Sequence, residues 1–137
     1  MTILWRPSSK KIASTQMVDF AKCVGQHSDD QDFDYDQLWE WSINFREDFW
    51  RSVWDFCEVI GERGDVILVD DQMPGAHWFP EAKLNFAENL LRRKDGGEAI
   101  VFSGEDGERI SISYLELFEK VRRMQGALKK VGVVEGD

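Results

Sequence analysis

An aromatic helical stripe in the first half of the chain most limits how this sequence can fold. Its apolar residues recur every three or four positions, which is the spacing of one helix face. They are Phe45, Phe49, Val53, Phe56 and Ile60, and Trp50, Trp54 and Cys57 widen the same face. A stripe this wide must pack against another surface, because so much apolar area is unfavourable in water.

Capping residues predict where this helix and its neighbours begin. Asn44, with Glu47 three residues later, is predicted to cap the aromatic helix, and Gly61 and Gly64 are predicted to end it. A shorter helix is expected from Tyr35 to about residue 42.

Polar caps predict further helices on either side. One begins after Ser14 or Thr15 and ends at Gly25. Another is opened by Asn85, with Glu88 in the reciprocal position and a buried face of Phe86, Leu90 and Leu91.

The last third of the chain has a different pattern. Ala99–Phe102 and Arg109–Ile112 read as two strands of a hairpin, joined by a turn at Gly104–Gly107, while the run Val66–Val69 suits a short strand earlier on. Ser113 and Glu116 form a capping box that opens a helix ending at Gly132. Two strands and a helix are typical of the start of an α/β domain, so a further strand is expected beyond residue 137.

The fold class expected from these patterns is mixed α/β. A mostly helical, Trp-rich extension over residues 1–94 would precede an incomplete domain over residues 95–137. The 137 residues carry 26 Asp and Glu against 17 Lys and Arg, a formal net charge of −9, which argues against nucleic acid as a partner. We see no secretory signal and no apolar run of about 20 residues for a membrane span, so a cytoplasmic location is expected.

Candidate chemistry is sparse. The Asp-rich segment 28–36 lacks the glycine and terminal glutamate of a calcium loop and is interpreted as a solvated acidic loop. His27 is expected to be exposed and His77 to be structural. Cys23 and Cys57 are interpreted as small core residues with free thiols. The sequence contains no phosphate-binding glycine motif. Gly104–Gly107 is interpreted as a hairpin turn, because the two acids between its glycines would repel a phosphate.

Four tryptophans leave two interpretations open: a stacking platform for a sugar or peptide, or core packing, which their helical spacing favours. They are Trp39, Trp41, Trp50 and Trp54. On these observations no catalytic, cofactor-binding or metal-binding residue is assigned within the chain.

Several motifs together resemble a known family. They are Trp5-Arg6-Pro7, the segment Tyr35–Trp39, Phe49-Trp50 with Val53–Phe56, Trp78-Phe79-Pro80, and the segment Leu84–Leu91. In this order they are similar to the N-terminal region of the adenylate-forming acyl-CoA synthetases, and among these to the acetoacetyl-CoA synthetases. Glu81 departs from the pattern, because a glycine is common after the Trp-Phe-Pro motif.

The resemblance implies a fragment of a longer acetoacetate–CoA ligase that uses Mg-ATP and CoA, whose catalytic motifs lie later in the chain. The fragment alone would be inactive, and its partner would be the rest of its own polypeptide. There are three alternatives: another short-chain acyl-CoA synthetase, an independent protein-interaction module with exposed Trp faces, and a sugar-binding domain. The wide stripe also predicts that the fragment self-associates or stays partly molten.

Overall fold

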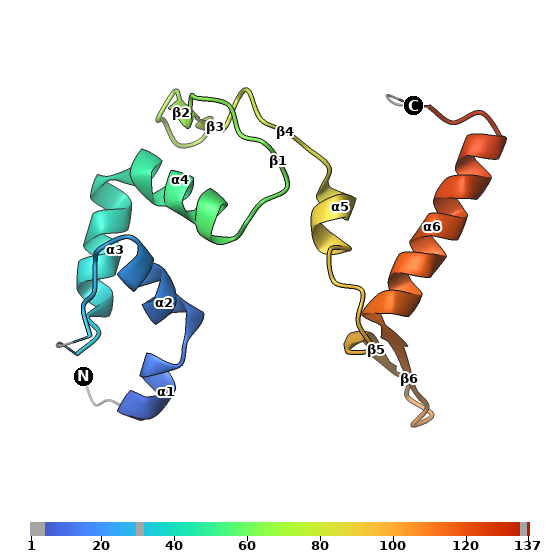
Figure 1. The fold of residues 1–137 in the computed structure, drawn as a ribbon, viewed down its shortest axis with the longest axis horizontal. Helices are drawn as coiled ribbons and strands as arrows, with labels where there is room; N and C mark the ends of the chain where they lie inside the picture. Colours follow the sequence, from blue (N-terminus) through green and yellow to red (C-terminus); the bar gives the residue numbers. More distant parts are fainter. Residues whose placement is uncertain (1–4, 30–31, 135–136) are drawn as a thin grey trace. The chain divides into compact units, whose positions relative to one another are not determined.

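The computed structural model describes residues 5–29, 32–134 and 137, and these form a mixed α/β arrangement (Figure 1). Contacts divide the chain into two compact units, residues 1–84 and 85–137. The first unit is mostly helical with short strand pairs, and the second combines a hairpin with a long helix. The fold class expected from the sequence is therefore confirmed.

The first unit begins with α1 (Ser9–Ala13) and α2 (Gln16–Cys23). The Thr15 hydroxyl accepts a hydrogen bond from the Val18 amide at the start of α2, as the sequence predicts. Gly25 follows the helix with a φ of +71°, a conformation that glycine adopts without steric cost. The short α1 was not predicted, because five residues are too few to show a helical period.

The two aromatic helices are α3 (Tyr35–Asn44) and α4 (Arg46–Phe56). The predicted cap of α4 is wrong, because Asn44 is the last residue of α3 and Phe45 stands at the junction. Asp34 supplies the cap of α3 instead, accepting hydrogen bonds from the Asp36 and Gln37 amides at 2.9 and 3.3 Å. The aromatic helix also ends at Phe56, four residues earlier than the predicted Ile60.

The core of this unit lies where α2 meets the two aromatic helices. Phe20, Ala21 and Leu38 are buried there, with Phe49 and Phe56 packed against them. The Phe20 ring lies 5.8 Å from the Phe49 ring and 5.2 Å from the Phe56 ring, both edge to face. The aromatic stripe thus finds its partner surface in α2, over part of its width.

Two antiparallel strand pairs complete the unit. β1 (Gly61–Glu62) pairs with β4 (Lys83–Leu84), and β2 (Leu68–Val69) pairs with β3 (His77–Trp78). The predicted strand over residues 66–69 is therefore shorter, and Ile67 beside it is 1% exposed. The Glu81 carboxylate accepts hydrogen bonds from the Asp65 and Val66 amides at 3.0 and 3.4 Å, so it ties the loop before β2 to the loop before β4.

The second unit opens with α5 (Phe86–Leu90), whose start is capped by the Asn85 side chain. β5 (Glu98–Ser103) and β6 (Arg109–Ser113) form the predicted hairpin, and α6 (Tyr114–Lys130) follows directly. The Ser113 capping box is present in full, which explains why the strand turns into a helix at this residue.

Much of the apolar surface of this unit faces solvent. Phe86 and Leu90 are 72% and 60% exposed, so the prediction that they form a buried face is wrong for this chain. On α6, Val121, Met124 and Leu128 are also exposed. Periodicity marks these faces as apolar, but the described residues of the unit leave them exposed.

Candidate functional site

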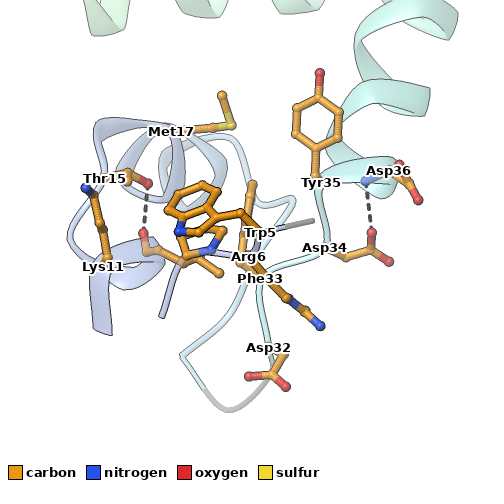
Figure 2. Close-up of a pocket in the computed structure, with 12 residues that line it drawn as sticks. Trp5, Arg6, Lys11, Thr15, Met17, Asp32, Phe33, Asp34, Tyr35 and Asp36 are labelled. Atoms are coloured by element: carbon orange, nitrogen blue, oxygen red, sulfur yellow. Dashed lines mark hydrogen bonds between the residues drawn. The ribbon is translucent and has the colours of Figure 1, made fainter. Parts of the chain in front are cut away.

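One cavity of the first unit lies between the N-terminal segment, α2 and the start of α3 (Figure 2). Its volume is about 750 Å³. The residues around it are Trp5, Arg6, Pro7, Lys11, Ile12, Thr15, Met17 and the segment 32–36. Figure 2 shows the Trp5 ring between Met17 and Tyr35 at one end and Asp32 at the other.

The charges around this cavity do not define one class of ligand. Arg6 and Lys11 contribute positive charge, and Asp32, Asp34 and Asp36 contribute negative charge. The Asp34 carboxylate is already engaged in capping α3. The Trp5 side chain is 72% exposed, so it does not enclose a ligand. No local pattern in the sequence predicts this cavity, because it joins segments about 30 residues apart, although Trp5-Arg6-Pro7 is one of the motifs of the sequence.

A second, apolar groove lies between α2, α3 and α4. Its volume is about 380 Å³, and it is lined by Met17, Phe20, Leu38, Trp39, Phe56 and others. Met17 and Trp39 are 47% and 49% exposed, so the rim of the groove presents apolar surface to solvent. Part of the aromatic stripe, Phe49, Val53, Phe56 and Cys57, also lines the groove.

The four tryptophans divide between the two interpretations. Trp41 packs in the core, with its ring 6.4 Å from that of Phe20. Trp54 lies 5.1 Å from Phe79, and Trp50 lies 5.7 Å from Trp78, which ties α4 to the segment around β3. Trp39 lines the apolar groove and makes no ring contact within the described residues, so packing against other rings accounts for three of the four tryptophans.

The histidines and cysteines do not come together. His27 is half-buried rather than exposed, with its ring 5.6 Å from that of Phe33. His77 is exposed in β3, opposite Val69. Cys23 and Cys57 are exposed thiols, so the expectation that they are core residues is wrong. Cys23 is the last residue of α2, and Cys57 caps the end of α4.

The described residues contain neither a cluster of metal ligands nor a membrane-spanning helix. Within residues 5–29, 32–134 and 137, no three His, Cys, Asp or Glu side chains group as metal ligands would. Part of the acidic loop lies outside the described residues, at positions 30 and 31. Across the described part of the chain, no helix combines the length and apolar character required to cross a bilayer.

An ion pair and a capping box lie near the hairpin of the second unit. The Arg93 guanidinium donates hydrogen bonds to Asp95 at 2.9 and 3.0 Å and lies 4.0 Å over the Tyr114 ring. The hydrogen bond from Arg93, with a second from the Gly97 amide, holds the pKa of Asp95 below its usual value. The Ser113 amide and hydroxyl lower the pKa of Glu116 in the same way. These contacts fix the start of α6 against the segment before β5, so we interpret them as structural.

Comparison with known proteins supplies what the site geometry does not. Residues 35–90 match the family described as acetyl-coenzyme A synthetase N-terminus. Over 98% of its length the chain is 42% identical to an acetoacetyl-coenzyme A synthetase from Rhizobium meliloti (strain 1021) and 36% identical to a malonamoyl-CoA synthetase from Penicillium aethiopicum. A solved acetoacetyl-CoA synthetase from Streptomyces lividans covers the whole chain with a TM-score of 0.80 and 30% identity.

The matched proteins are much longer than this chain. It spans 21% of the Rhizobium relative, 20% of the Penicillium relative and 22% of the Streptomyces structure. Together with the N-terminal family match, this agrees with the resemblance that the tryptophan motifs indicated. Over nearly its whole length, the chain therefore corresponds to the N-terminal region of the acetoacetyl-CoA synthetases.

Proposed function

We propose that this chain is the N-terminal region of an ATP-dependent acetoacetate–CoA ligase. In the proposed reaction the acetoacetate carboxylate attacks ATP, pyrophosphate leaves, and the acetoacetyl group then passes from AMP to the CoA thiol. The observation that carries the proposal is the 42% identity over 98% of the chain to a protein named acetoacetyl-coenzyme A synthetase. The partner of the region would be the remainder of the same polypeptide.

The residues that carry out the reaction would lie outside these 137 residues. No described residue is assigned to ATP, Mg²⁺ or CoA: the cavity at Trp5 carries charges of both signs, and the groove between α2, α3 and α4 is apolar. No step of the reaction is therefore assigned to a residue of this chain. Residues 1–94 would form an N-terminal extension, and residues 95–137 would begin the adenylating domain.

The structure suggests what the region contributes to such an enzyme. α6 and the hairpin carry exposed apolar residues, among them Ile100, Phe102 and Met124, that a larger domain would bury. Burial of this surface would stabilise both the region and the rest of the enzyme, at about 25 cal/mol per Å² of apolar area. A cytoplasmic location is part of the proposal, supported by the exposed thiols of Cys23 and Cys57, which a reducing compartment would preserve.

A second candidate differs only in the acid. The relative named malonamoyl-CoA synthetase is 36% identical over the same 98% of the chain, so this region is shared by proteins named for different acyl groups. Another short-chain acyl-CoA synthetase is therefore the alternative.

The test is to sequence the gene beyond codon 137 and to assay the polypeptide that the whole reading frame encodes. The proposal expects the frame to continue, and the product to form acetoacetyl-CoA from acetoacetate, ATP and CoA. Acetate, propionate and malonamate are the comparison substrates. A stop codon after Asp137 in the natural gene would overturn the proposal, whereas higher kcat/KM for another of these acids would favour the second candidate.

A further inference from the structure

We draw no further inference here: the strongest candidate, the apolar groove between α2, α3 and α4 that Met17, Trp39 and Phe56 line, carries none, because nothing in the described residues shows what covers it.

Discussion

Removing the Phe20 ring is the sharpest perturbation of the first unit, because this side chain joins α2 to the aromatic helices. Phe20 is 8% exposed, and its ring contacts those of Trp41, Phe49 and Phe56. Replacing a buried phenylalanine by alanine costs about 3–5 kcal/mol, through lost burial and the cavity left behind. A unit of residues 1–84 has a total stability of about 4–13 kcal/mol. Phe20→Ala is therefore expected to remove at least about a quarter of it.

Urea unfolding of the 137-residue chain, followed by tryptophan fluorescence, measures this loss. Trp41 lies beside Phe20 and reports on the same core. At a slope of about 1–3 kcal/mol per molar urea, the midpoint is expected to fall by about 1 M or more. Phe45→Ala is the matched control, because Phe45 lies in the same unit but is 57% exposed. Its unfolding free energy is expected to change by less than about 1 kcal/mol.

An equal urea midpoint for Phe20→Ala and the unchanged chain would contradict this expectation. It would mean that α2 does not pack on the aromatic helices in solution. A broad transition in the unchanged chain, with little near-UV circular dichroism, would instead agree with the partly molten state expected of the stripe.

Three further predictions concern caps, charge and backbone conformation. Ser113→Ala removes the capping box of α6 and is expected to lower the free energy of unfolding by about 1 kcal/mol. Urea unfolding followed by circular dichroism measures this loss, and Ser111→Ala is the control. Equal losses in the two variants would contradict the prediction. Because the pKa of Glu116 is lowered in the folded chain, its stabilisation is complete above its usual value of 4.5 and is lost as pH falls through the folded pKa. Stability measured from pH 6 to 3 should thus fall less steeply in Glu116→Gln than in the control Glu105→Gln, and parallel curves would reject this. Gly64→Ala should lower the free energy of unfolding by about 1–3 kcal/mol more than Gly25→Ala does. Both glycines have positive φ, but a Cβ at Gly64 would lie 2.5 Å from the Glu81 Cβ, while a Cβ at Gly25 would meet open space. Equal losses of unfolding free energy would contradict the close contact at Gly64.

Local signals in the sequence located most of the helices and the hairpin. Thr15, Asn85 and Ser113 cap helices where they were expected to, because a capping side chain acts on amides two or three residues away. Asn44 failed as a cap because Phe45 alone separates α3 from α4, so the preceding helix runs through Asn44. A local pattern cannot show which of two adjoining helices takes a residue.

Non-local features were beyond the sequence. The pairing of β1 with β4 and of β2 with β3 involves two-residue strands, which are too short for any alternation to show. Likewise, periodicity marked the apolar faces of α5 and α6 but not whether anything covers them. The cavity at Trp5 depends on the folding of the N-terminal segment against residues 32–36, which only the structure reveals.

Under the proposed function, this chain is a non-catalytic N-terminal part of an adenylate-forming ligase. Acetoacetate-dependent exchange of radiolabelled pyrophosphate into ATP tests it most directly, because the exchange requires only the first half-reaction. Exchange is expected from the polypeptide that the whole reading frame encodes, and none above background from the purified 137-residue chain. Exchange by the 137-residue chain alone would contradict the proposal. A complete polypeptide that shows no exchange with acetoacetate or with any other short acid would also contradict it.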